Sequence, residues 1–308
     1  MLEATELTLP VPWGHVSAIS WGSSKNPPVL VVHGNQDNAG AFTRLIELLP
    51  ETYHYVAIDL PGHGLSSHFP QGMNLDFFNF VLTLRYVLDE LNWKHCFYLG
   101  HSFGGQIGVM FSILFPGRLQ KVVTIDALMN NGFSPAETVE RVKITHGATL
   151  FAVGKKQSQL YTGEEVLDAL MNKRQFKLNK KAAEALMVRA VTKVGDKYRY
   201  NRDVRLRVHV GLYFNDEQNL QFFSHLDTPV LFLHPKNSYF GLLSKMYMAE
   251  MYKEKFPKFV TVVPVEGNHD VHNNAPENIA SYIVAFFEDT TKCKLQEVED
   301  KCQKMSIQ

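Results

Sequence analysis

The hexapeptide Gly100-His101-Ser102-Phe103-Gly104-Gly105 lies between two apolar stretches, residues 96–99 and 106–111. This context predicts a strand, a tight turn and a helix in succession. Glycines before and after Ser102 avoid side-chain clashes in a strained turn. Such a turn lifts the Ser102 Oγ clear of the sheet at a helix N-terminus, whose dipole favours developing negative charge. The hexapeptide therefore predicts a nucleophilic serine.

Apolar runs alternate with helical patterns on both sides of this turn. Continuous apolar runs such as residues 28–32 are typical of parallel strands that are buried on both faces. Strands separated by helices favour a doubly wound α/β fold with a mostly parallel sheet. The predicted strands are residues 6–11, 15–21, 28–32, 55–58, 96–99, 121–125, 229–233 and 260–264, and the predicted helices outside the region discussed next are residues 39–49, 76–91, 106–115 and 275–288.

The alternation breaks after the strand that ends near Asp126. Most of the following residues, to about 222, have helical patterns. The predicted helices are residues 135–146, 164–171 and 180–191. We therefore expect an α/β core formed by residues 1–127 and 223–288, a helical cap, or lid, inserted at residues 128–222, and a polar C-terminal tail at residues 289–308.

Charge is balanced over the whole chain but not along it. The 308 residues carry a formal net charge of zero, so we expect no general affinity for nucleic acid. Between Arg141 and Arg207, however, the sequence contains 16 Lys and Arg residues but only 6 Asp and Glu residues. This excess is explained either by a solvated helical face or by a basic rim that attracts anionic substrates, or makes weak contact with a membrane surface.

Three cysteines do not suffice for a disulfide framework. Cys96 falls in a predicted core strand and is expected to be a buried thiol, whereas Cys293 and Cys302 fall in the polar tail and are expected to be reduced. The N-terminus lacks the apolar segment of a signal peptide, and no apolar run approaches transmembrane length. The last three residues do not match the peroxisomal S-K-L address. We expect a cytoplasmic protein, and the sequence does not indicate an oligomeric state.

Candidate catalytic groups follow the carboxyl ends of predicted strands, where ligands of such sheets bind. Ser102 is the expected nucleophile, and His269, in the loop before the final helix, is the expected base. His272 is a weaker candidate for the base. The backbone amides of Asn35 and Phe103 are the expected oxyanion donors.

The acid that orients His269 is harder to assign. The loop at residues 234–241 contains no Asp or Glu. Asp126, at the end of the strand after Ser102, is the favoured candidate. Asn237 could orient a histidine without a charge. Asp216 and Glu217 remain further alternatives.

Several segments resemble the α/β-hydrolase superfamily, and more narrowly the serine hydrolase-like, or kraken-like, family. The resemblance runs from about residue 7 to residue 287 and implies the α/β-hydrolase fold and a serine hydrolase without a cofactor or metal. Asn35 is similar to the residue at that place in haloalkane dehalogenases, but the aspartate nucleophile of those enzymes is replaced here by Ser102. The segments that carry the resemblance are residues 33–38, 59–67, 100–105, 192–194, 201–206 and 267–272.

Two functions follow as hypotheses. The first is a serine esterase that cleaves small or lipid-like carboxylic esters through Ser102, His269 and Asp126. The second is a weak or inactive relative that binds a small apolar ligand under the cap. It is suggested by the loop at residues 234–241, where many relatives carry the acid and this chain has neither Asp nor Glu. Large apolar side chains of the cap are expected to pack its helices more than to line a pocket; these are Phe151, Leu170, Met171, Phe176, Leu186 and Met187.

Overall fold

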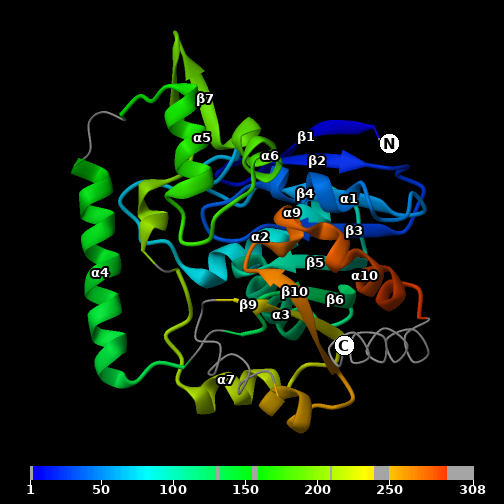
Figure 1. Ribbon diagram of the computed structural model, residues 1–308. Helices are drawn as coiled ribbons and strands as arrows, with labels where there is room; N and C mark the ends of the chain where they lie inside the picture. The colour runs from blue at the N-terminus through cyan, green and yellow to red at the C-terminus, as the bar shows by residue number, and fades with distance from the viewer. Residues whose placement is uncertain (1–2, 130–131, 155–158, 209, 239–249, 290–308) are drawn as a thin grey trace.

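A twisted eight-stranded sheet forms the centre of the molecule (Figure 1). The structure is a computed structural model that describes residues 3–129, 132–154, 159–208, 210–238 and 250–289. The strand order is β1-β2-β4-β3-β5-β6-β9-β10, and all pairs from β4 to β10 are parallel. The sheet strands are β1 (Ala4–Val11), β2 (Gly14–Trp21), β3 (Pro28–Val32), β4 (His54–Ile58), β5 (Cys96–His101), β6 (Leu119–Ile125), β9 (Val230–Asn237) and β10 (Val260–Asn268). The predicted mostly parallel, doubly wound α/β fold is confirmed.

Alternating side chains of the central strands supply two apolar layers. In β3, Leu30 and Val32 face one layer, whereas Val29 and Val31 face the other. Burying each such side chain contributes about 1.5–3 kcal/mol. Helices α2 (Phe77–Glu90) and α3 (Phe103–Leu114) cover the first layer, and α1 (Thr43–Ile46) and α10 (Ala280–Phe287) cover the second. Both faces are therefore covered, as a parallel sheet requires.

Two predicted helices are shorter than expected. The segment 39–49 forms a 3-10 helix, η1 (Ala39–Phe42), followed by the single turn of α1. The segment 275–288 begins with η3 (Pro276–Asn278), after the short α9 (Val271–Asn274), and only then forms α10. Pro276 lacks an amide hydrogen and cannot continue a preceding helix, so the chain restarts there.

The chain between β6 and β9 was expected to be mostly helical, and the structure adds one hairpin that was not predicted. Residues 128–222, which we call the insert, also contain an antiparallel hairpin. Its two-residue turn contains Gly195 at φ 65°, a conformation that glycine adopts without strain. The insert elements are α4 (Pro135–Gly154), α5 (Gly163–Asn172), α6 (Lys180–Ala190), β7 (Val191–Val194), β8 (Lys197–Tyr200), η2 (Val204–Arg207) and most of α7 (Asp216–Phe223).

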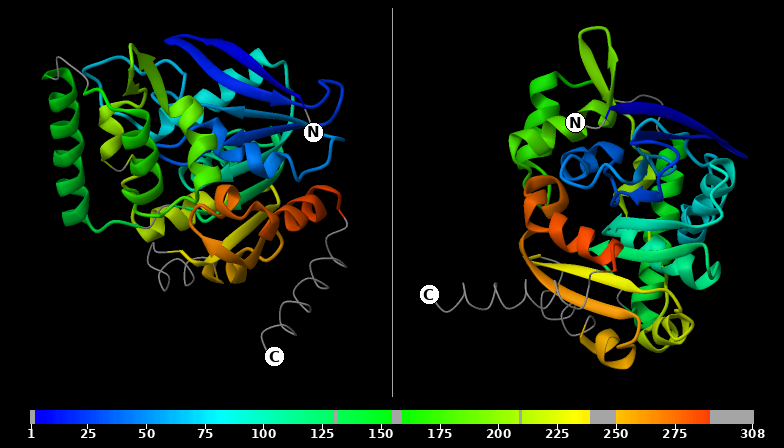
Figure 2. Two further views of the ribbon diagram at one scale, coloured as in Figure 1. Left: turned by 45° about the horizontal axis from the view of Figure 1, so that its top comes forward. Right: turned by 90° about the vertical axis from the view of Figure 1, so that its right-hand side faces the viewer.

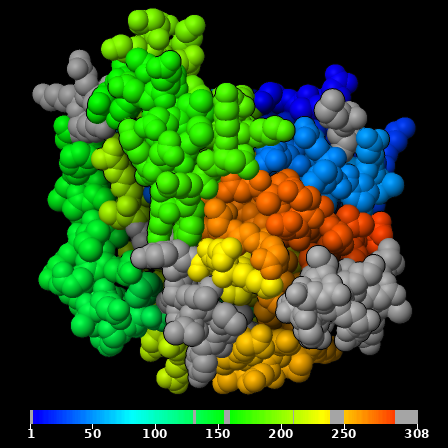
Figure 3. Space-filling model, viewed as in Figure 1, coloured from blue at the N-terminus to red at the C-terminus, as the bar shows by residue number. Residues whose placement is uncertain are grey.

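The insert lies against the C-terminal part of the core. Figure 3 shows the green α5–α6 region directly beside the orange segment that follows β10. The Asn179 amide donates to Asn274 Oδ1 at 2.9 Å, which joins the start of α6 to the end of α9. In contrast, α4 stands at the edge of the molecule in both Figures 1 and 2. The insert is therefore anchored to this part of the core through α6, whereas α4 contacts the core elsewhere, where Thr149 Oγ1 donates to Asn74 Oδ1 at 2.7 Å.

Cys96 is buried and free, as expected, and burial raises the pKa of its thiol to about 12. Cys293 and Cys302 lie outside the described residues.

Among the described helices, none combines the length and apolar character needed to cross a bilayer.

Arg189 of α6 joins the insert to the sheet through a buried ion pair. Its Nη2 lies 2.8 Å from Asp59 Oδ2 and also donates to Ser17 Oγ at 3.0 Å. Its Nη1 pairs with Glu6 of β1. The Asp59 side chain is fully buried and that of Arg189 is 1% exposed. Although burial opposes the charge, the Asp59 carboxylate raises the pKa of Arg189.

Replacing Arg189 by methionine is expected to reduce the free energy of unfolding by about 3–5 kcal/mol, because Asp59 would keep a buried charge without its cation. Urea unfolding followed by circular dichroism measures this change. Arg199→Met is the matched control, since Arg199 is exposed on β8 and should change stability by less than about 0.5 kcal/mol. Equal effects of the two substitutions would contradict the role given to Arg189.

Candidate active site

Ser102 lies on a strained turn between β5 and α3, with φ 49° and ψ −116°. Its amide donates to the Ile125 carbonyl of β6 at 2.8 Å. A Cβ atom at Gly104 would lie 2.3 Å from the Val32 carbonyl oxygen, and one at Gly100 would lie 2.7 Å from the backbone of Gly104. Only glycine fits at these positions, as the sequence predicted.

A cavity of about 710 Å³ lies beside Ser102. His269, Asn35 and Phe103 line it together with Ser102. The structure thus brings together at one cavity the predicted nucleophile, the predicted base and both predicted oxyanion donors.

The insert supplies part of the cavity wall. Leu170 and Phe176 line the cavity, and the Phe176 ring lies 4.7 Å from that of His269. Leu186 is buried within the insert, as expected for packing. Phe151 is 57% exposed on α4, so the prediction that it packs cap helices is wrong.

Asp126 lies behind His269 and contacts it directly. The His269 Nδ1–H donates to Asp126 Oδ2, and Ser238 Oγ donates to the same oxygen at 2.6 Å. Asp126 is fully buried, and its φ of 55° lies in the left-handed region, directly after β6. The structure therefore brings the favoured acid to the predicted base.

The alternative acids lie elsewhere. The Asn237 side chain is exposed at the end of β9. Asp216 accepts a hydrogen bond from the Gly132 amide at the start of α7, where Glu217 is also exposed. The hydroxyl of Ser238 supports the carboxylate of Asp126 from the loop that lacks an acid of its own.

The loop after β3 presses against the serine turn. A Cβ atom at Gly34 would lie 3.2 Å from Ser102 Cβ, so a larger residue would push the loop away. His33 braces the loop: its Nδ1 donates to the Gly34 carbonyl at 2.7 Å, and its Nε2 accepts from the Leu60 amide at 2.9 Å. Burial lowers the pKa of His33 to about 4, so the ring is neutral.

The amides of this loop have different partners. Gln36, at φ 65°, donates its backbone N–H to His63 Nε2 at 3.0 Å. Within the described part of the chain, the backbone amides of Asn35 and Phe103 have no hydrogen-bond acceptor. Two amide donors therefore remain for a ligand oxygen in the cavity, which is the arrangement of an oxyanion hole.

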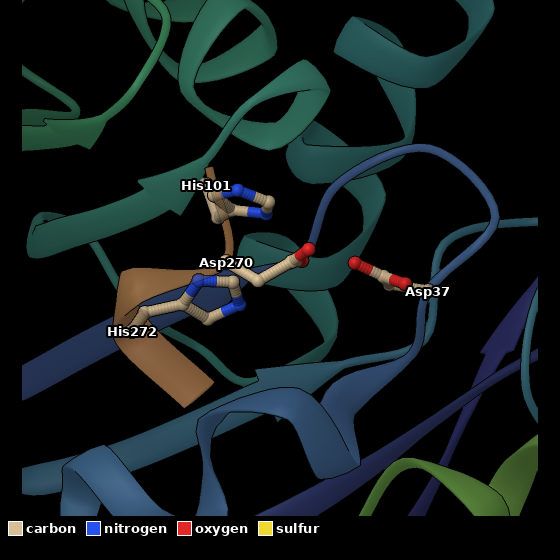
Figure 4. Close-up of side chains that lie close together, drawn as sticks. All are labelled: Asp37, His101, Asp270 and His272. Carbon is tan, nitrogen blue, oxygen red and sulfur yellow. The ribbon is translucent and has the colours of Figure 1, made fainter. Parts of the chain in front are cut away.

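A buried polar cluster that the sequence analysis missed lies behind this loop. Asp37, His101, Asp270 and His272 bring one ligand-type atom each within 4.8 Å of one another (Figure 4). Arg174 bridges the two carboxylates, at 2.6 Å from Asp37 and 3.3 Å from Asp270. No regular sequence spacing marks these residues, because they come from the loop after β3, the end of β5, and the turn and short helix after β10.

Histidines and carboxylates are ligands for divalent metals, but Arg174 already occupies the carboxylates of this cluster. Burial would raise the pKa of Asp37, but the Arg174 guanidinium lowers it. For Asp270, burial prevails and the pKa is raised. A second cation would be repelled by the guanidinium. We therefore interpret the cluster as an ion-pair brace that joins the loop after β3, the insert and the loop of His269.

Comparisons with known proteins agree with this fold. A family model described as "alpha/beta hydrolase fold" matches residues 27–276. The chain is 34% identical over 296 residues to a serine hydrolase-like protein of Danio rerio, covering 92% of this chain and 89% of the relative. It is 35% identical over 299 residues to serine hydrolase-like protein 2 of Homo sapiens, covering 93% and 95%.

Solved structures share the fold. A hypothetical protein of Pseudomonas aeruginosa PAO1 superposes with a TM-score of 0.81 at 25% identity, over 92% of this chain and 99% of that chain. An esterase of Mycobacterium tuberculosis superposes with a TM-score of 0.67 at 21% identity, over 94% of this chain and 92% of that chain. The fold is therefore shared with an esterase, and at this identity the likeness concerns the fold alone.

Proposed function

Because the chain belongs to the α/β-hydrolase family, among its serine hydrolase-like members, we propose that it cleaves carboxylic esters through an acyl-enzyme. The observation that carries this proposal is the hydrogen bond from His269 Nδ1–H to the buried carboxylate of Asp126, at the wall of the cavity that Ser102 lines. A binding protein has no need for an oriented imidazole beside a strained serine.

In the proposed mechanism, Ser102 Oγ attacks the ester carbonyl while His269 accepts the hydroxyl proton. Asp126 keeps the proton on His269 Nδ1, so that Nε2 acts as the base, and stabilises the imidazolium that forms. The amides of Asn35 and Phe103 hold the oxyanion, at about 3 kcal/mol of barrier for each donor. His269 then returns the proton to the leaving alcohol, and water releases the acyl group by the same steps. These residues require no cofactor.

We assign residues 1–127 and 223–288 to a catalytic core and the insert to a cap over the cavity. The contact between Phe176 and His269 supports this assignment, because a cap in this position excludes water from the reacting groups. The proposed boundary at residue 223 falls within α7, where Phe223 is buried against Tyr252 of the core. We further propose that the protein works in the cytoplasm.

Labelling with a fluorophosphonate probe tests the nucleophile. We expect the wild-type protein to be labelled, Ser102→Ala not to be labelled, and His269→Ala to be labelled at least about 1,000-fold more slowly, because no other group would take up the serine proton. Ser112→Ala is the control, since Ser112 is a buried helical serine outside the cavity. Labelling that survives Ser102→Ala would move the nucleophile elsewhere.

The alternative, a ligand-binding protein without turnover, was motivated by the loop that lacks an acid. The contact between Asp126 and His269 weakens that motive. A wild-type protein that resists the probe would favour this alternative.

A further inference from the structure

The cavity beside Ser102 is lined by cations that are not all neutralised. The cationic side chains in its wall are Arg141, Lys173, Arg174 and Arg202. Among the described residues of the wall, Asp37 is the one carboxylate, and Arg174 engages it. The cavity therefore has an excess of positive charge.

Two of these cations have carboxylate partners. Arg174 lies between Asp37 and Asp270, in the brace described above. Lys173 pairs with Asp168 of α5 at 2.8 Å. Neither side chain is free to pair with a ligand without losing a partner.

Arg202 differs from these cations. Its Nη1 donates to the neutral Gln36 Oε1 at 2.9 Å, and its guanidinium carbon lies 5.1 Å from the centre of the Tyr200 ring. No carboxylate of the described residues lies within 4 Å of it. Burial lowers the pKa of Arg202; the charges of Arg207 and Arg174 act in the same direction, and Tyr200 and Asp37 act against it. The half-buried Arg202 side chain therefore gains an ion-pair partner only when an anion binds in the cavity.

Arg202 lies close to the proposed oxyanion hole. Its partner Gln36 follows Asn35, the proposed oxyanion donor, and both line the same cavity. Arg141 of α4 also reaches the wall, with its guanidinium carbon 4.3 Å from the Phe133 ring and no carboxylate of the described residues within 4 Å. A substrate at Ser102 would thus meet two cations that form no close ion pair among the described residues, although Asp37 and Glu137 attract them at longer range.

We propose that the cavity binds substrates that carry a second, anionic group, a carboxylate or a phosphate, which pairs with Arg202 and is attracted by Arg141. A planar guanidinium can hold either group through two hydrogen bonds. The substrate class would then be a half-ester of a dicarboxylic acid, or an ester with a phosphate at its other end. The ester part of this class rests on the proposed function, whereas the binding of the anion does not.

Matched esters test the preference. Mono-p-nitrophenyl glutarate carries a carboxylate, and p-nitrophenyl pentanoate has the same chain length without it. We expect the wild-type kcat/KM to favour the glutarate ester by at least about 10-fold, and Arg202→Gln to reduce this preference by about 10- to 100-fold, mainly through KM. Arg199→Gln should keep the preference, because Arg199 is exposed and outside the cavity wall.

Binding to Ser102→Ala separates this inference from catalysis. Calorimetry with mono-p-nitrophenyl glutarate should show binding that Arg202→Gln weakens by about 10- to 100-fold in the Ser102→Ala background. If this binding occurs but the wild-type protein cleaves neither ester, the inference stands and the proposed function fails. If the wild-type protein cleaves both esters equally, the proposed function stands and the inference is wrong.

Two further measurements complete the test. Competition by glutarate and by inorganic phosphate identifies the preferred group, and the failure of both to slow hydrolysis of the neutral ester would overturn the inference. Thermal unfolding distinguishes binding from a structural role: Arg202→Gln should unfold at the same or a higher temperature, because a half-buried cation without a close carboxylate partner is removed. A lower unfolding temperature, together with equal loss on both esters, would assign Arg202 a structural role only.

Discussion

Asp126→Asn is expected to lower kcat on a p-nitrophenyl ester by about 1,000- to 10,000-fold. In the structure, Asp126 Oδ2 accepts hydrogen bonds from both His269 Nδ1–H and Ser238 Oγ. An asparagine amide placed there would donate to Nδ1 and so favour the tautomer with the proton on Nε2. His269 could then no longer accept the Ser102 proton, and no carboxylate would stabilise the imidazolium.

Steady-state kinetics with p-nitrophenyl butyrate measure this effect, which should fall on kcat with KM nearly unchanged. Ser238→Ala is the matched control, because it removes one hydrogen bond from the same carboxylate without changing the tautomer. We expect a loss of less than about 10-fold in that variant. An Asp126→Asn protein with nearly wild-type turnover would rule out Asp126 as the residue that orients His269.

Acid is expected to unfold the protein cooperatively between about pH 6 and pH 4. The reason is a set of histidines with 0–1% exposure, His33, His63, His101 and His272. Burial lowers the pKa of His33 to about 4 and those of His63 and His101 to about 3, and it lowers the pKa of His272 as well. A buried imidazolium would lose its hydration without gaining an equivalent partner.

The direction of the pH effect follows from the proton count. Below pH 6.5 the histidines of the unfolded chain take up protons that the folded chain does not bind until about pH 4 or lower. Stability is therefore lost as the pH falls through this range, by up to about 1.4 kcal/mol per pH unit for each histidine. The raised pKa of Asp270 acts in the opposite direction but belongs to a single group.

Urea unfolding at a series of pH values measures the slope. His272→Phe removes one proton-binding site from the stack with His101 and should reduce the slope by about 1.4 kcal/mol per pH unit. His225→Gln is the control, because His225 is exposed and should leave the slope unchanged. Stability that stays constant from pH 7 to pH 5 would contradict this account.

The core of the fold was predictable because its signals are local. The buried strands are continuous apolar runs, and Gly100–Gly105 marks a turn that few other sequences can form. The β7–β8 hairpin was missed because its strands are short, largely exposed and rich in lysine and arginine. Its turn at Gly195 did carry a signal, since a glycine between two short strands is typical of a two-residue hairpin loop.

Only those site residues could be predicted whose positions follow from the order of the strands along the chain. Asp126 and His269 are 143 residues apart, and their pairing was inferred from strand order. The contacts of Arg174 and Arg202 with the loop after β3 span 137 and 166 residues, and no spacing predicts them. The excess of basic residues between Arg141 and Arg207 was the one sign of them, and a basic rim for anionic substrates was one of its two explanations.

The buried pair of Arg189 and Asp59 limits how far the insert can be exchanged between relatives. A chimera that receives a foreign insert keeps Asp59 in the core, where its oxygens also accept the amides of Ala39 and Leu65. Unless the donor segment brings a guanidinium to the same place, the recombinant carries an uncompensated buried charge. Libraries that diversify the insert should therefore hold Arg189 fixed, or replace Asp59 and Arg189 together.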